Sequence, residues 1–187
     1  AIVVNGNGVW LSDAAAVSAG RQQYDATADD IRYDDVTAEK HGVYLWTLDG
    51  NGEDAWVHGK IERVTADTDI LMGFMIGNRA PADWLFVGLG YTGADNKISW
   101  ARYQNNALSA ITNIETPYAT NPVFFRIQCQ GAGNYLIKYG SSDANAKAHA
   151  GSVIAGPLNP KWAVFAAVAI TGASKTTSYR YDDFFIH

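Results

Sequence analysis

The sequence predicts an all-β protein, built as a two-sheet antiparallel sandwich or a barrel with little helix. Short runs rich in β-branched and aromatic residues recur along the chain, and turns rich in Gly, Asn and Asp separate them. Only residues 12–19 have a convincing helical pattern. The chain of 187 residues is 48% apolar and 18% charged, which is typical of one folded globular domain.

The first 40 residues are predicted to form a separate segment that packs on the sandwich or leads into it. Ser12 can cap a short helix that ends at Gly20. Residues 22–35 are polar and acidic, which favours a solvated loop and leaves a calcium site as the alternative. The sandwich itself is predicted to occupy residues 41–187.

Predicted strands follow one another at short intervals, and residues 141–160 are predicted to be a polar loop between two of them. Residues 69–77 and 162–171 are apolar at successive positions, which predicts strands in the middle of a sheet with both faces covered. The predicted strands are 43–48, 56–64, 69–77, 84–91, 97–104, 107–114, 124–130, 134–139, 162–171 and 178–186.

Residues 124–139 give the clearest local pattern, a β-hairpin closed by a three-residue loop that contains two glycines. Its core face is predicted to pair Cys129 with Tyr135, Ile127 with Ile137, and Phe125 with Tyr139. Cys129 is the only cysteine, so it is interpreted as a small buried apolar group. Phe125, Ile127, Ile137, Val164 and Phe165 are expected to be buried.

The outer face of the same hairpin carries an unfavourable pair. Arg126 lies opposite Lys138 in this register. Two like charges directly opposite each other are destabilising unless an acid or a bound anion lies over them. The simpler interpretation is that both side chains extend into water.

Three stretches resemble one known superfamily: WVHGKIERVTADTDILMGFMIGN, FFRIQCQGAGNYLIKYGSSD and YRYDDFFIH. Residues 56–186 are similar to the concanavalin A-like jelly roll, of the laminin G and family 16 glucanase type. The resemblance implies a two-sheet antiparallel jelly-roll sandwich.

The glucanases of this superfamily place two Glu around an Asp on one strand, because general acid and nucleophile must lie close together. This motif is absent, since the Glu residues are spread along the chain as Glu39, Glu53, Glu62 and Glu115. The four His show no local zinc-ligand spacing. The protein is therefore predicted not to be an enzyme.

The aromatic content points to a ligand instead. Six Trp and ten Tyr are present, and aromatic rings bind the apolar faces of sugars while amides and charged groups bind the hydroxyls. On the second strand of hairpin 84–105 the side chains of Trp100 and Arg102 share one face and Tyr103 lies on the other, so one of these sets must face the core. The predicted ligand-binding residues are Trp84, Tyr91, Asn96, Trp100, Arg102, Tyr103 and Asn105.

The resemblance also implies a structural calcium ion, held by the Asp of the closing strand. Asp183 occupies that position. One Asp is not enough for six to eight oxygen ligands. The predicted partner is Asp35, with its neighbour Asp34 or the backbone around Gly50 as alternatives. The simpler interpretation is that Asp183 forms a hydrogen bond with a neighbouring loop and no ion is bound.

Three functions are compatible with the sequence. The predicted location is extracellular or on a virion surface. The first function is a non-catalytic, lectin-like carbohydrate-binding module that is part of a larger secreted or virion protein and binds a glycan or polysaccharide. The alternative is a structural or host-recognition domain of a viral or phage spike or fibre, which would form a homo-oligomer, a trimer in a spike. A glycan hydrolase with an unrecognised site is the third. The net charge of −5 argues against nucleic-acid binding, and no long apolar run predicts membrane insertion.

Overall fold

The computed structural model describes the backbone of residues 8–10, 22–25, 30–36, 41–47, 55–65, 70–79, 81–92, 95–105, 107–169 and 175–186. Side chains are described for residues 55–64, 70–78, 81–90, 95–105, 107–163 and 179–183. The predicted helix at residues 12–19 lies outside the described residues.

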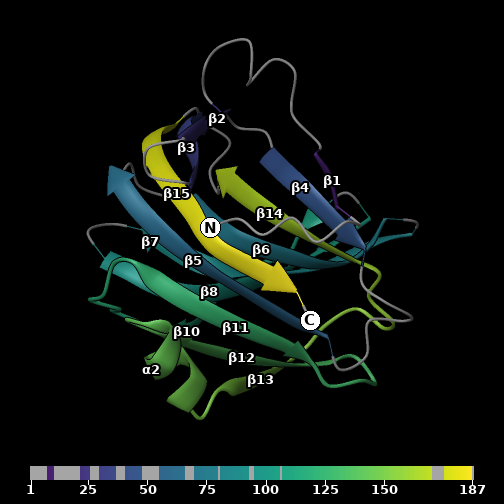
Figure 1. Ribbon diagram of the computed structural model, residues 1–187. Coiled ribbons are helices and arrows are strands. Elements are labelled where there is room, and N and C mark those ends of the chain that lie inside the picture. The colour runs from purple at the N-terminus through teal and green to yellow at the C-terminus, as the bar shows by residue number, and fades with distance from the viewer. Residues whose placement is uncertain are drawn as a thin grey trace.

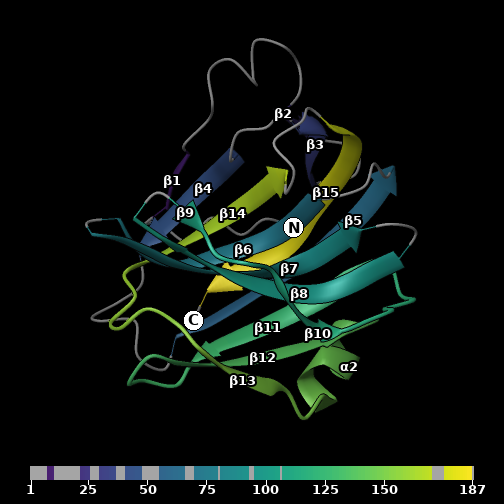
Figure 2. The ribbon, with the colours of Figure 1, turned by 180° about the vertical axis from the view of Figure 1, so that it is seen from behind.

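Two antiparallel sheets form the fold. Sheet A runs in the order β1 (Gly8–Trp10), β4 (His41–Thr47), β14 (Trp162–Ala169), β6 (Ile70–Arg79), β7 (Ala82–Thr92), β8 (Asp95–Gln104) and β10 (Thr112–Glu115), with β9 (Ala107–Leu108) paired to β8. Sheet B runs in the order β13 (Ser152–Ala155), β12 (Asn134–Gly140), β11 (Val123–Cys129), β5 (Trp56–Thr65), β15 (Lys175–Ile186), β3 (Asp30–Val36) and β2 (Gln22–Asp25). Figures 1 and 2 view the molecule from opposite sides, with sheet B in front in the first and sheet A in front in the second. The predicted all-β two-sheet sandwich is confirmed.

The described parts of the acidic segment 22–35 are strands rather than a loop. They form β2 and β3, and β3 pairs with β15 from Ile31 to Val36. The prediction of a solvated loop was wrong because pairing with a neighbouring strand outweighs the weak β-propensity of Asp. Together with β1, these strands bring parts of the first 40 residues into both sheets.

The predicted loop 141–160 also contains regular structure. Helix α2 (Asp143–Ala148) begins after Ser142, whose hydroxyl accepts a hydrogen bond from the backbone N–H of Asn145 at 3.2 Å. Asp143 in the first turn and Lys147 in the last turn both complement the helix dipole. Strand β13 then pairs with β12. The short helix escaped prediction because its six residues have no apolar periodicity.

The main core lies between the sheets, where alternate residues of each strand meet. Strands β6 and β14 lie inside sheet A, as their continuous apolar runs predicted. Phe125, Ile127 and Ile137 are buried as expected, whereas the side chains of Val164 and Phe165 lie outside the described residues. The hairpin register is also confirmed, with Cys129 opposite Tyr135 and Arg126 opposite Lys138.

Aromatic residues link the two sheets at the centre of this core. Phe74 on β6 contacts Phe125 of β11, with ring centroids 6.0 Å apart, and Tyr181 of β15, at 6.1 Å. The Tyr181 hydroxyl accepts a hydrogen bond from the Gly73 N–H at 3.1 Å and donates to the Gly73 carbonyl at 3.2 Å. The relative position of the sheets is therefore set by direct contacts between β6, β11 and β15.

Candidate functional site

A cavity of about 930 Å³ lies at one end of the sandwich. The turn between β6 and β7, the end of β8 and the connection from β13 to β14 meet there. The strand register explains this meeting, because Gly77 pairs with both Trp84 and Trp162, and Leu85 pairs with Arg102. The described residues that line the cavity are Asn78, Pro81, Asp83, Arg102, Leu158, Asn159, Lys161 and Trp162.

A charged pair forms one wall of the cavity. The Arg102 guanidinium donates two hydrogen bonds to the Asp83 carboxylate, from Nε at 2.6 Å and from Nη2 at 2.8 Å. Both side chains are mostly buried, at 20% and 24% exposed. This bidentate geometry orients both groups before any ligand arrives, and the remaining guanidinium N–H groups and carboxylate lone pairs can bind hydroxyl groups.

An aromatic cluster supports another part of the cavity. Trp162 is half-buried and packs against Trp84, which is 8% exposed. Tyr103, Met75 and Ala82 belong to the same cluster. Trp162 thus lines the cavity, while its ring packs with Trp84 and Tyr103 on the face of sheet A opposite to Arg102.

The third wall, the connection between β13 and β14, is tied to both sheets. The Asn78 side-chain amide donates to the Leu158 carbonyl at 2.9 Å, and the Lys161 N–H donates to the Gly77 carbonyl at 3.0 Å. The Tyr135 hydroxyl donates to the Pro157 carbonyl at 2.8 Å. Burial raises the pKa of Tyr135 above its usual range, so this hydroxyl keeps its proton. These bonds hold the wall in one position.

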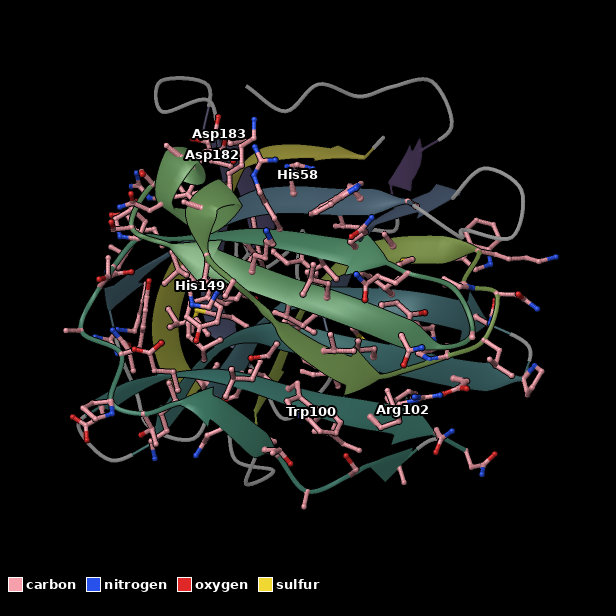
Figure 3. The ribbon with its side chains drawn as sticks, turned by 90° about the horizontal axis from the view of Figure 1, so that it is seen from below. His58, Trp100, Arg102, His149, Asp182 and Asp183 are labelled. Carbon is pink, nitrogen blue, oxygen red and sulfur yellow. The ribbon has the colours of Figure 1, made fainter. Side chains whose placement is uncertain are left out.

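The predicted 84–105 platform does not form as one surface. Trp100 packs against the main core, and Asn96 is buried, with its side-chain oxygen bonded to Arg63. Asn105 is exposed at the end of β8. Figure 3 shows Trp100 and Arg102 together on β8, far from the labelled His58.

The other described residues of the predicted set lie on the opposite side of sheet A from Trp100 and Arg102. Trp84 and Tyr103 lie in the cluster behind Trp162, and the side chain of Tyr91 lies outside the described residues. Of the described members of the predicted set, only Arg102 lines the cavity. The platform fails because successive residues of a strand point to opposite faces, so one hairpin cannot present them all.

The remaining cavity residues were missed because they come from separate strands. A weak signal was present, since Asp83 follows Pro81 in one turn and Trp162 follows Pro160 in another. Polar and aromatic residues beside turns are candidates for a binding site. The order of the strands in the sheets determines which turns lie at the same end of the molecule, and local sequence does not reveal that order.

The predicted calcium ligands lie far apart. Asp34 pairs with Ser178, five positions before Asp183, and Asp35 is one position farther away. At about 3.3 Å per residue, roughly 15–20 Å separates Asp35 from Asp183. Calcium ligands must all lie within about 2.6 Å of the ion, so these two residues cannot share one. No group of three potential metal-binding side chains occurs among the described residues, and calcium binding as such stays a prediction.

Asp182, the neighbour of Asp183, forms an ion pair instead. Its carboxylate accepts a hydrogen bond from Lys60 Nζ at 2.7 Å, and the Asp183 N–H donates to it at 2.7 Å. Burial disfavours both charges, but these contacts outweigh it. The pKa of Asp182 is therefore held below 3.8 and that of Lys60 above 10.5.

We expect this pair to stabilise the fold between about pH 4 and pH 10. Asp182→Asn should lower the free energy of unfolding by about 1 kcal/mol near neutral pH. The difference from the parent should vanish in acid, where the carboxyl is protonated, and again above the pKa of Lys60. Denaturant unfolding across pH measures it, and a deficit that persists unchanged in strong acid would contradict this assignment.

No described helix is long and apolar enough to cross a membrane. No protein-family model and no curated protein matches the chain. The similarities to known proteins therefore come from the comparison with solved structures.

Three solved structures have a fold similar to this two-sheet sandwich. A Bacteroides ovatus protein, described as xyloglucan PUL GH43B, has a TM-score of 0.67 at 11% identity, over 98% of this chain and 37% of that one. A bifunctional GH43-CE protein of Bacteroides eggerthii has a TM-score of 0.65 at 13% identity, over 90% of this chain and 22% of that one. The chain thus spans well under half of either protein. Toad ovary galectin, solved in complex with thio-digalactose, has a TM-score of 0.50 at 13% identity, over 82% of this chain and 98% of that one. The two sheets and these likenesses together show that the chain has the concanavalin A-like jelly-roll fold.

Proposed function

We propose that the protein is a non-catalytic carbohydrate-binding module, and that the cavity at the end of the sandwich is its binding site. One observation carries the proposal. Trp162, the bidentate Asp83–Arg102 pair and the amides of Asn78 and Asn159 line a single cavity. Sugar-binding sites commonly combine an aromatic side chain with fixed polar groups nearby, and both kinds of residue line this cavity.

The size and rigidity of the cavity support this proposal. Its volume of about 930 Å³ lies within the range of small-ligand sites. Hydrogen bonds within the protein fix the Asp83–Arg102 pair and the connection before β14. A prearranged site loses less conformational entropy when a weakly held sugar binds. The toad galectin of this fold, which binds thio-digalactose, is further support.

The carboxyl groups at the cavity support the non-catalytic part of the proposal. Glycoside hydrolysis generally uses two carboxyl groups, about 5–5.5 Å apart in retaining enzymes and roughly 6.5–9.5 Å apart in inverting ones. Among the described residues that line the cavity, Asp83 supplies the single carboxylate, and Arg102 already binds both of its oxygens. This use of the Asp83 carboxylate supports binding rather than bond cleavage as the proposed role of the cavity.

A glycan array followed by titration calorimetry tests the proposal. We expect the parent to bind a defined set of neutral glycans. Trp162→Ala should weaken that binding about tenfold to a hundredfold, as for other aromatic anchors. Thermal melting of the variant checks that the fold persists after the contact with Trp84 is lost. An array without a bound glycan would overturn the proposal.

Asp83→Asn provides a second test that does not depend on Trp162. It keeps the shape of the side chain but removes the charge that orients Arg102, so binding should again weaken. Asp143→Asn is the matched control, because Asp143 forms the same kind of bidentate pair with Arg126 on sheet B. Equal losses in both variants would place the sugar elsewhere. Release of reducing ends from the bound glycan would overturn the non-catalytic assignment.

The spike or fibre alternative, the homo-oligomer and the extracellular or virion-surface location stay predictions. No described contact favours them over a binding module.

A further inference from the structure

A second cavity, of about 460 Å³, lies on the outer face of sheet B. Its described lining residues are Trp56, Arg126, Lys138 and Lys147. They come from β5, β11, β12 and helix α2 respectively. The cavity is therefore lined by three cationic side chains and one indole, and it lies on the other sheet from the cavity that contains Trp162.

The strand register brings these residues together. Arg126 pairs with His58 on β5 and with Lys138 on β12. Trp56 is two residues before His58, so it lies on the same face of the sheet, and its ring centroid lies 5.8 Å from that of His58. Helix α2 packs against β11 and β12 and adds Lys147 from its last turn.

The unfavourable pair that the sequence predicted is present, and it is partly compensated. The Arg126 guanidinium donates to Asp143 of α2, from Nε at 2.8 Å and from Nη2 at 2.6 Å. The hydrogen bond from Arg126, aided by the charges of His58 and Lys147, lowers the pKa of the Asp143 carboxyl. Asp143 thus lies beside the like-charge pair of Arg126 and Lys138 and offsets part of their repulsion.

The compensation is incomplete. Among the described residues of this cavity and of helix α2, the single carboxylate of Asp143 faces the charges of Arg126, Lys138 and Lys147. Lys138 Nζ donates to the backbone carbonyl of Lys147 at 3.2 Å, which holds the ammonium under the helix but neutralises no charge. The described lining is therefore positive in a chain whose net charge is −5. An anion in the cavity would remove the remaining repulsion.

We propose that this cavity is a second site, which binds an acidic saccharide through a carboxylate or sulfate group. The anion would bind to Lys138 and Lys147, and the apolar face of the sugar ring would lie on Trp56. An indole beside ammonium groups suits a charged sugar better than a bare inorganic anion, which has no apolar face. The small cavity and the overall negative charge disfavour a long nucleic acid.

Calorimetry with an oligogalacturonide and its methyl ester tests the site, because esterification removes the charge and keeps the sugar chain. A sulfated dextran oligosaccharide, compared with plain dextran, tests sulfate in the same way. We expect the protein to bind at least one charged probe, to bind its uncharged counterpart far more weakly, and to lose affinity as salt increases. Equal binding of charged and uncharged forms, or no binding of either charged probe, would overturn the proposal.

Substitutions locate the site. Lys147→Gln should weaken binding of the charged probe about fivefold, and Lys138→Gln with Lys147→Gln about tenfold or more. Lys97→Gln is the matched control, since it removes one positive charge from β8 of the other sheet. A loss in Lys97→Gln as large as in Lys147→Gln would show that the attraction is not local, and would overturn the proposal.

This inference does not depend on the proposed function. Trp162→Ala should leave binding of the charged probe unchanged, while Lys147→Gln should leave neutral-glycan binding unchanged. Loss of charged-probe binding in Trp162→Ala would place the acidic sugar in the first cavity and overturn the second site.

Discussion

Truncation of Phe74 to alanine is expected to lower the free energy of unfolding by about 3–5 kcal/mol. Phe74 is completely buried at the centre of the sandwich, and its ring contacts Phe125 and Tyr181 of the opposite sheet. Removal of the ring leaves a cavity, because the closely packed side chains around Phe74 can relax only partially. Chemical denaturation of the parent and the variant measures the loss.

Phe124→Ala is the matched control for this prediction. Phe124 is next to Phe125 on β11, but it lies on the outer face and is only half-buried. The same truncation should therefore cost far less there. Equal losses for the two variants would show that contact between the sheets at Phe74 does not dominate the stability of the fold.

Replacement of Gly73 by alanine is expected to destabilise the protein by about 3 kcal/mol or more. A Cβ atom on Gly73 would lie 2.0 Å from the Val87 carbonyl oxygen and 2.6 Å from the Gly88 Cα atom. Both contacts are with the backbone of β7, which cannot rotate away as a side chain can. The two hydrogen bonds between Gly73 and the Tyr181 hydroxyl also hold Gly73 in place. β6 and β7 would have to separate, with loss of their pairing.

Gly90→Ala is the matched control, because it adds the same methyl group to a glycine of the same strand pair, on β7. Its added Cβ would meet the Ser99 Oγ atom at 2.9 Å, and that hydroxyl can move. We expect a small change in melting temperature for Gly90→Ala and a large one for Gly73→Ala. Similar melting temperatures for the two variants would contradict the close approach of β6 and β7 at Gly73.

Local patterns predicted the elements that depend on neighbouring residues. The loop from Gly131 to Gly133 determined the hairpin register, and with it the burial of Ile127 and the pairing of Arg126 with Lys138. The continuous apolar runs of β6 and β14 predicted strands covered on both faces. The acidic strands β2 and β3 and the short helix α2 escaped prediction, because their own residues favour other structures and distant partners stabilise them.

The role of each tryptophan could not be predicted in this way. Trp100 and Trp162 both lie in strands with apolar residues on both faces. The alternation of apolar and polar residues therefore does not predict which face of each strand packs against the other sheet. Only the packing of sheet B showed that Trp100 contacts the main core while Trp162 lines a cavity.

The sequence by itself determined the fold class, most strand positions and the hairpin register, because turn residues and alternation act over a few residues. The tertiary structure decided which residues line the same cavity. Asn78 and Asp83, Arg102, and Trp162 belong to separate stretches of the chain, and the strand order β14, β6, β7, β8 brings them to one end of the sandwich. That order depends on backbone pairing between distant segments and on the burial of both sheets against each other, which no local pattern encodes.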